Sequence, residues 1–319
     1  MSERRNIVVA FDGTGNKPDM NDDGVSDSSN VDKFRKALMN RKSNPTVKIY
    51  KQGVGTRYGE EVTGNAFGVG LESIIQSAYR GLQQYLTDGK FEKNRVFVIG
   101  FSRGAYAARR FCHLVDFSGI PLDVNDWNTG WRNFIDQDGQ SADLKRSGKF
   151  FNVEIEMLGV WDTVKAAPTI SNIKDAVLPS NVKNAYHAVS IDERRRQFDV
   201  LRIRRNKRTR EVWFAGVHSD IGGGYAERGL SDITLSWMVA HAIGHGLEFK
   251  ASCLEKTLEP NPDGTLHDSL KGWPFGSVVR TIRATDLIHY TVRERIAELA
   301  DYNPVNLPDN PIFVDQDYV

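Results

Sequence analysis

The segment Arg95–Tyr106, RVFVIGFSRGAY, carries a Gly-x-Ser-x-Gly motif between an apolar run and a helical pattern. Residues Arg95–Ile99 are typical of a buried β-strand, and Ala105–Val115 is typical of a helix. A serine at such a strand–helix turn is held in a strained backbone conformation that projects its hydroxyl above the sheet. The motif therefore predicts Ser102 as a nucleophile, with an ordinary tight turn as the structural alternative.

Strand and helix patterns alternate along the rest of the chain. Further short β-rich runs end in small or polar residues, at Asn6–Phe11, Thr46–Tyr50, Glu154–Val160 and Glu211–Val217. Helical patterns cover Leu71–Leu86 and Leu235–Ile243. This alternation predicts a single α/β domain over residues 1–319, with a mainly parallel sheet flanked by helices and a site at the carboxyl ends of the strands.

Two segments are expected to be insertions near this site. Residues 121–149 are polar but hold Trp127, Trp131 and Phe134, and residues 166–185 contain two prolines. Long loops in α/β enzymes often carry function, so at least one is predicted to line or cover the cleft, with plain surface loops as the alternative. The chain after about residue 250 is less periodic and is expected to wrap the core.

Two further strand ends supply the partners that a serine nucleophile needs. Asp162 follows one predicted strand, and His218 follows the next. A base takes the serine proton and a carboxylate orients that base, and the chain order Ser, Asp, His is that of the α/β hydrolases. The competing interpretations are a loop-capping Asp162 and a structural His218. His289 is the alternative base, whereas His187 lies in a segment with a helical pattern and is expected to be structural.

An acyl-transfer site also needs two donors for the developing oxyanion. The backbone N–H of Arg103, directly after the nucleophile, is the first, and Gly13-Thr14 at another strand end fits best as the second. A rival interpretation is a metal or phosphate site formed by two aspartates and a glycine run, Asp12, Asp220 and Gly222-Gly223-Gly224. The run that begins at Asp12, DGTGN, lacks the first aspartate of the similar DxDGT phosphotransferase motif, so no metal and no cofactor are predicted.

Composition narrows the class of protein. The net charge is +1, and the basic run between Arg194 and Arg210 is expected to be a solvated face or an ion-pair network, so no nucleic-acid partner is predicted. Cys112 and Cys253 are too few for a disulfide framework. The N-terminal apolar run of about five residues is too short for a signal peptide, and no stretch has the length of a membrane span. A cytoplasmic protein is expected.

In combination, these motifs resemble the DUF2235 family of α/β hydrolases, which includes the Tle1-type phospholipase effectors of the type VI secretion system. The matching stretches extend through nearly the whole chain and are Phe11–Asn16, Gly53–Thr56, Gly100–Tyr106, Gly159–Val164, His187-Ala188 with Asp192–Arg195, Trp213–Tyr225, Ile288-His289 and Tyr302–Leu307. The resemblance implies a catalytic triad at Ser102, Asp162 and His218. It also implies ester hydrolysis, with phospholipase A-type activity on glycerophospholipids in the secreted members.

The large effectors of that family carry additional regions associated with membranes or the secretion machinery, and this chain is similar to their catalytic domain alone. The resemblance implies a lipid or acyl-ester substrate, peripheral membrane contact, and a secretion-system or immunity partner. Export without a cleavable signal peptide is compatible with it. Three other functions compete: a non-lipid esterase or thioesterase with the same triad, a catalytically silent binding domain, and a metal-dependent phosphohydrolase.

Overall fold

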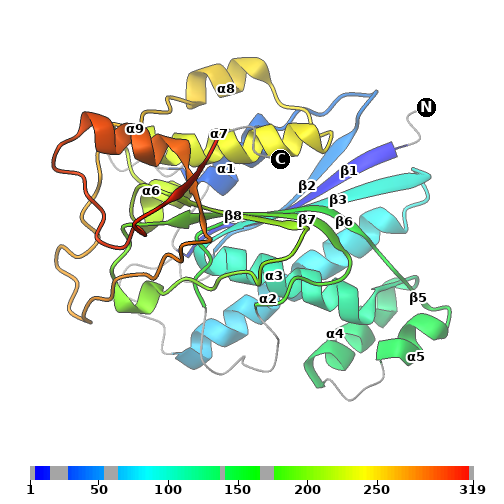
Figure 1. Ribbon diagram of the computed structural model, residues 1–319. Helices are drawn as coiled ribbons and strands as arrows, with labels where there is room; N and C mark the ends of the chain where they lie inside the picture. Colours follow the sequence, from blue (N-terminus) through cyan, green and yellow to red (C-terminus); the bar gives the residue numbers. More distant parts are fainter. Residues whose placement is uncertain (1–3, 15–27, 54–63, 137–140, 166–175, 316–319) are drawn as a thin grey trace.

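The computed structural model describes residues 4–14, 28–53, 64–136, 141–165 and 176–315, and its central feature is an eight-stranded sheet (Figure 1). The strands follow the order β10-β9-β8-β7-β6-β3-β1-β2, and every neighbouring pair is parallel. Their bounds are β1 Arg4–Phe11, β2 Thr46–Lys51, β3 Lys93–Phe101, β6 Ile155–Trp161, β7 Val182–Ser190, β8 Thr209–Phe214, β9 Leu287–His289 and β10 Ile312–Val314. Because the strands are parallel, the residues that follow β3, β6 and β8 meet at one edge of the sheet.

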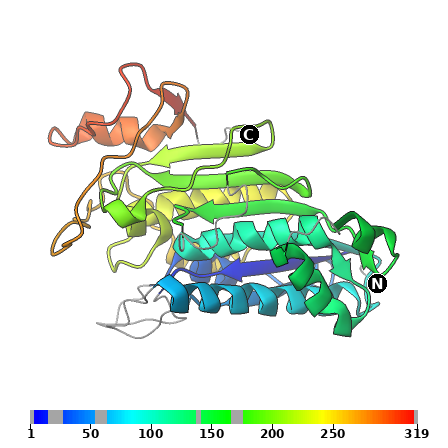
Figure 2. The same ribbon diagram turned by 90° about the horizontal axis from the view of Figure 1, so that it is seen from below.

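Helices cover both faces of this sheet, and the architecture is that of an α/β-hydrolase-like fold (Figures 1 and 2). The helices α2 and α3 lie on one face, and α1 and α7 lie on the other. The helix bounds are α1 Asn30–Ala37, α2 Gly64–Leu86, α3 Ser102–Ser118, α4 Trp127–Asp136, α5 Ser141–Arg146, α6 His218–Gly222, α7 Gly229–Gly244, α8 Ala251–Thr257 and α9 Tyr290–Glu298. Within the described ranges, none of these helices is both long and apolar enough to cross a bilayer.

Strand β1 shows why the sequence forms a sheet that is covered on both sides. Ile7, Val9 and Phe11 pack in one apolar cluster with α2 and α3, whereas Val8 and Ala10 pack in another with α1 and α7. Successive side chains of a strand point to opposite faces, so an unbroken apolar run needs a helical layer on each. These side chains are at most 1% exposed, and burying a Val, Ile or Phe side chain stabilises the fold by about 1.5–3 kcal/mol.

All five predicted strands are present, as β1, β2, β3, β6 and β8, but the helix expected around His187 is wrong. That segment forms β7, and each residue from Ala185 to Ser190 is buried because β7 pairs with β6 on one side and β8 on the other. The last four residues of the expected insertion 166–185 therefore belong to a central strand. Residues 166–175 of that insertion lie outside the described part of the chain.

The described part of the other expected insertion, 121–149, lies away from the carboxyl ends of the strands. It contains α4 and α5 and is bordered by a short antiparallel pair, β4 Ile120–Pro121 and β5 Phe150–Phe151. The Ser118 hydroxyl donates to the Gly130 carbonyl at 2.7 Å and holds α4 against the last turn of α3. Helix α3 begins at Ser102, so its last turn, and α4 beside it, lie at the edge where the strands begin (Figure 1). The expected position of this insertion over the cleft is therefore wrong.

The C-terminal region extends the sheet as well as wrapping it. Strands β9 and β10 continue the sheet beyond β8. Val292 of α9 packs in an apolar cluster with Trp213 of β8 and Ile288 of β9. These strands are only three residues long, and a run that short carries too little periodicity to predict from sequence.

Candidate active site

Ser102 lies at the junction of β3 and α3, where the backbone turns sharply. Its φ angle is +60°, a left-handed conformation that residues other than glycine rarely adopt. The flanking glycines permit the turn, because a Cβ at Gly104 would overlap the carbonyl oxygens of Phe11 and Asp12, and one at Gly100 would overlap the Gly104 carbonyl. The local sequence thus holds Ser102 at the carboxyl end of β3 with 5% of its surface exposed.

His218 reaches Ser102 from the segment after β8. Its Nε2 lies 2.8 Å from Ser102 Oγ, and its Nδ1 lies 2.6 Å from Asp162 Oδ2. An ionised carboxylate only accepts hydrogen bonds, so Nδ1 carries the proton and Nε2 accepts from the serine hydroxyl. Three side chains from three strand ends therefore form one hydrogen-bonded chain, Ser102–His218–Asp162.

Asp162 follows β6 in a left-handed conformation, with φ +37°, and is fully buried. The backbone N–H of Ser190 donates to its Oδ1 at 3.0 Å. Arg280 donates to the same carboxylate twice, to Oδ1 at 2.6 Å and to Oδ2 at 3.0 Å. Together with the bond from His218, these contacts fix the orientation of the carboxylate from several directions.

Charge compensation keeps Asp162 ionised despite its burial. Burial alone raises the pKa of this carboxyl, but the Arg280 guanidinium and the hydrogen bond from His218 outweigh it and hold the pKa well below its usual value. Arg280 is buried as well and also donates to the backbone carbonyls of Ser190 and Phe198. The result is a buried salt bridge in which each partner offsets the cost of burying the other, although Arg280 Nε has no hydrogen-bond partner among the described residues.

The imidazole of His218 contacts two aromatic rings. The ring centroids of Phe101 and Phe198 lie 4.7 and 5.0 Å from it, and the backbone N–H of His218 donates to buried Glu193 at 3.2 Å. Burial lowers the pKa of His218, although the Asp162 carboxylate acts in the opposite direction. The ring is therefore neutral near pH 7 and can accept a proton.

His187 accepts a hydrogen bond from the residue after Asp162. The backbone N–H of Thr163 donates to His187 Nε2 at 3.1 Å, so the neutral ring carries its proton on Nδ1, which faces Glu211 at 2.8 Å. His187 is completely buried and has the structural role expected for it, although on a strand instead of a helix.

Of the three expected oxyanion donors, one is already engaged. Asp12 Oδ1 accepts from the Gly13 N–H at 2.7 Å, while Oδ2 accepts from the Tyr50 hydroxyl at 2.7 Å. The Thr14 hydroxyl is buried and has no hydrogen-bond partner among the described residues. Thr14 lies after β1, the neighbour of β3, and Arg103 is the second residue of α3. Gly15 and Asn16, the rest of that motif, lie outside the described residues.

The remaining candidates pair with residues outside the chain of Ser102, His218 and Asp162. His289 ends β9, where its Nδ1 is 2.8 Å from Thr291 Oγ1 and its ring stacks on Phe214. Asp220 pairs with His267 at 2.6 Å. Across the described ranges, no group of three or more His, Cys, Asp or Glu side chains is arranged to hold a metal ion.

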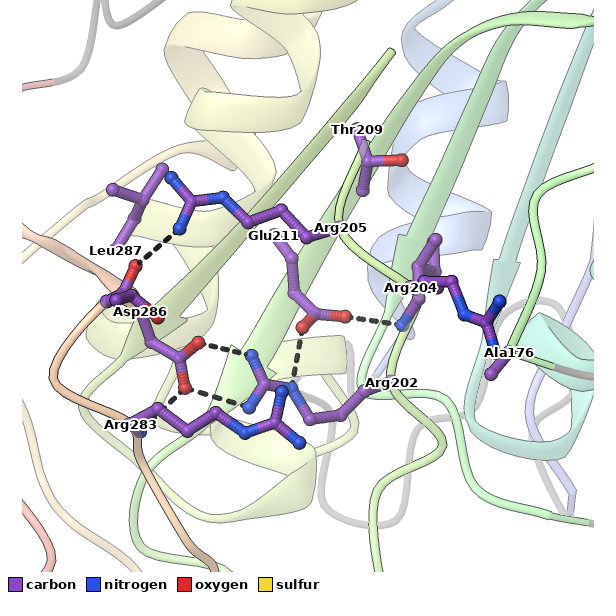
Figure 3. Close-up of a pocket in the computed structure, with 11 residues that line it drawn as sticks. Ala176, Arg202, Arg204, Arg205, Thr209, Glu211, Arg283, Asp286 and Leu287 are labelled. Carbon is purple, nitrogen blue, oxygen red and sulfur yellow. Dashed lines mark hydrogen bonds and ion pairs between the residues drawn. The ribbon is translucent and has the colours of Figure 1, made fainter. Parts of the chain in front are cut away.

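A separate cavity of about 400 Å³ opens at the opposite edge of the sheet, where β8 and β9 begin (Figure 3). Arg202 donates across it to Glu211 at 2.7 Å and to both Asp286 oxygens, at 2.8 and 2.6 Å. Part of the basic run is therefore an ion-pair network, one of the two alternatives expected from sequence. Neither Ser102 nor His218 lines this cavity, so it is separate from the candidate site.

Sequence patterns did not single out Arg280 or Phe198. Arg280 follows Asp162 by 118 residues in a segment without strand or helix periodicity. Phe198 ends a short 3-10 helix, Arg196–Phe198, within the basic run that was expected to be a solvated face or an ion-pair network. Neither segment has a motif that relates it to the nucleophile, so only the fold brings these residues to His218 and Asp162.

Known proteins resemble this chain in sequence and in fold. An uncharacterized Saccharomyces cerevisiae protein, YEL023C, is 25% identical over 235 residues, which are 63% of this chain and 33% of that protein. An uncharacterized protein from Pseudomonas aeruginosa has a similar fold, with a TM-score of 0.54 and 19% identity over 82% of this chain and 50% of that one. The Tle1 effector bound to the VgrG spike has a TM-score of 0.45 and 20% identity over 71% and 52% of the two chains.

The chain spans about a third to half of the length of these relatives. A family model described as the catalytic domain of the Tle1-like phospholipase effectors of the type VI secretion system matches residues 5–241, which is most of the chain. The match begins in β1 and ends in α7, so it includes Ser102, Asp162 and His218. The protein therefore belongs to the family of Tle1-like phospholipase effector catalytic domains, which implies that it is a hydrolase.

Proposed function

We propose that the protein is a serine esterase that cleaves an acyl ester of a glycerophospholipid. The observation that carries the proposal is the hydrogen-bonded chain from Ser102 Oγ through His218 to Asp162, at 2.8 and 2.6 Å. The strained φ of Ser102 supports it, because such a backbone persists only where the surrounding structure imposes it. Membership of a phospholipase effector family supports the lipid substrate.

The reaction would proceed in two halves. Ser102 Oγ attacks the ester carbonyl carbon while its proton passes to His218 Nε2, and Asp162 stabilises the imidazolium that forms. The negative oxygen of the tetrahedral intermediate accepts hydrogen bonds from the Arg103 N–H and from Thr14. The C–O bond to the leaving alcohol then breaks, and that alcohol takes the proton from His218. Water repeats these steps on the acyl-enzyme, releasing the fatty acid and restoring the Ser102 hydroxyl.

Replacement of Ser102 by alanine tests the proposal directly. The variant should lose phospholipid hydrolysis by on the order of 10⁵–10⁶-fold, since loss of a triad serine removes the nucleophile and not only a contact. Released fatty acid and lysophospholipid, identified by mass spectrometry, are the measurement. Ser147→Ala alters an exposed serine and is the matched control.

A fluorophosphonate probe separates the competing functions. It should label the unaltered protein at Ser102 and leave Ser102→Ala unlabelled, because only an activated serine reacts. An unlabelled protein would support a silent binding domain, and activity lost in chelator without labelling would support a metal-dependent enzyme. Labelling with hydrolysis confined to short acyl chains would support a non-lipid esterase or thioesterase.

A secretion-system or immunity partner and export without a cleavable signal are proposals that rest on family membership alone. Co-purification of the protein with a spike component of its own secretion system would support them. A protein found in the cytoplasm of secretion-competent cells, and never in their medium or in neighbouring cells, would contradict export.

A further inference from the structure

An apolar strip links His218 to the outer surface of the protein. The Phe198 ring contacts the His218 ring, with centroids 5.0 Å apart, and also contacts Trp273, at 5.7 Å. Trp273 in turn contacts Phe275 at 5.2 Å. We call this strip, together with the adjacent valines, the aromatic rim, which consists of Phe198, Trp273, Phe275, Val278 and Val279.

The outer part of the aromatic rim is exposed although it is apolar. Phe275, Val278 and Val279 are 46%, 41% and 47% exposed. The segment between α8 and β9 that contains them, orange in Figures 1 and 2, projects past the ends of the strands. Single exposed apolar residues are ordinary, but a group of them on one projecting segment beside a reactive site marks a contact surface.

The aromatic rim is anchored to the buried salt bridge. Val278 and Val279 directly precede Arg280, and the Val278 N–H donates to the Arg194 carbonyl at 2.8 Å. Arg280 also donates to the carbonyl of Phe198, so both parts of the rim are tied to one side chain. The rim is therefore connected by hydrogen bonds to the side chain that holds the Asp162 carboxylate.

Exposed basic side chains border the aromatic rim. Arg194 and Arg196 lie on one of its segments and Lys271 on the other. Within residues 194–199 and 268–279, which hold the rim, the exposed acids are Asp199 and Asp268, so three exposed cations face two exposed acids. The Arg195 guanidinium also lies over the Phe198 and Trp273 rings, at 3.5 and 5.3 Å from their centroids. Proteins bind an anionic lipid surface by inserting apolar side chains and by attracting the lipid headgroups with surrounding cations.

We propose that the aromatic rim inserts among the headgroups of an anionic phospholipid surface and so presents an acyl ester to Ser102. This inference rests on the proposed function. A lipid surface is favoured over a protein partner because the rim continues to His218, so whatever covers it also lies over the site. A protein bound there would obstruct the substrate, whereas a lipid surface contains it.

The test uses the full chain with Ser102→Ala, so that vesicles stay intact. Phe275→Ser with Val278→Ser should weaken binding to phosphatidylglycerol–phosphatidylcholine vesicles by about tenfold or more, because two half-exposed apolar side chains no longer insert. Leu122→Ser with Val124→Ser is the matched control, since these residues are 57% and 55% exposed at the opposite edge. The control should bind as the parent does, and added salt should weaken the binding of the parent and the control.

Hydrolysis provides the second readout. With Ser102 present, the rim variant should show a ratio of vesicle-lipid to soluble-ester hydrolysis about tenfold lower than the unaltered protein. Equal vesicle binding by the rim variant, or an equal loss in the control, would overturn the rim proposal while leaving the serine esterase proposal intact. A dimer in sedimentation that the rim substitutions dissociate would also overturn it, because a second copy would then be the occupant.

Discussion

Replacement of Arg280 by methionine is expected to move the acid limb of the pH–rate profile to higher pH. Arg280 Nη2 and His218 Nδ1 contact the same oxygen of Asp162, at 3.0 and 2.6 Å. The guanidinium charge therefore opposes protonation of His218, and methionine keeps most of the side-chain length without that charge. The pKa of His218 should rise in this variant, so its imidazole should be protonated at a pH where it is neutral in the unaltered protein.

The size of the shift follows from the shared oxygen. Two nitrogens bound to one atom at these distances are at most about 5.6 Å apart, and unit charges at that separation repel by about 3 kcal/mol at an effective dielectric constant of about 20. One pKa unit corresponds to about 1.4 kcal/mol, so this repulsion corresponds to a shift of about 2 units. Water entering the space left by the guanidinium raises the local dielectric, and we expect a shift of about 1 unit.

The assay is kcat/KM for a soluble acyl ester, measured from about pH 5 to pH 9, because this ratio reports the pKa of the base in the free enzyme. Loss of one partner of a buried pair costs about 3–5 kcal/mol of stability, so only variants that circular dichroism shows to be folded are compared. Arg280→Lys keeps the positive charge, and its acid limb should stay close to that of the unaltered protein. A uniform loss of activity in Arg280→Met, with the acid limb unmoved, would refute this reasoning.

Three further outcomes are expected. Asp162→Asn should lower kcat for the same ester by about 10⁴-fold, because the imidazole is no longer held in the required tautomer; an unchanged kcat would remove Asp162 from the mechanism. Gly104→Ala should lower the thermal midpoint far more than Gly244→Ala, since a Cβ at Gly104 overlaps the backbone after β1 and one at Gly244 meets open space. His289→Phe should retain kcat/KM, in contrast to His218→Phe, if His218 is the base. Burial lowers the pKa of His289 from 6.5 to about 3, so between these values only the unfolded chain takes up this proton. The unaltered protein therefore loses stability as the pH falls below 6.5. The free energy of unfolding, measured with denaturant at about pH 7 and about pH 5, should fall less in His289→Phe than in the unaltered protein.

The parts of the fold that could be predicted from sequence are those whose surroundings impose a simple pattern. Strands β1 and β3 are buried on both faces, and their apolar runs show it. Strand β7 is equally central, but Lys183 and Asn184 interrupt its run and a cluster of charged residues follows it, which together suggest a helix. Its pairing with β6 and β8 overrides that local preference, and pairing across the chain cannot be read from a local window.

The site divides in the same way. Ser102 is marked by the glycines that its turn needs, and Asp162 and His218 are marked by their positions after strands. Arg280 compensates the charge of Asp162 and donates to two backbone carbonyls, and a buried cation from any part of the chain could take this place. The Gly13 amide is engaged by the adjacent Asp12 side chain, a rotamer choice that no sequence pattern records.

The separation of Asp162 and Arg280 along the chain also means that the ribosome makes the two partners of this buried pair at different times. Arg280 is translated 118 residues after Asp162, and at about 5–20 residues per second this delay is roughly 6–24 s. During that interval β1, β3 and β6 can already pair, yet the buried carboxylate lacks its counter-charge. A nascent chain that already contains Ser102 and Asp162 therefore lacks the cation that balances the buried carboxylate until Arg280 has been made.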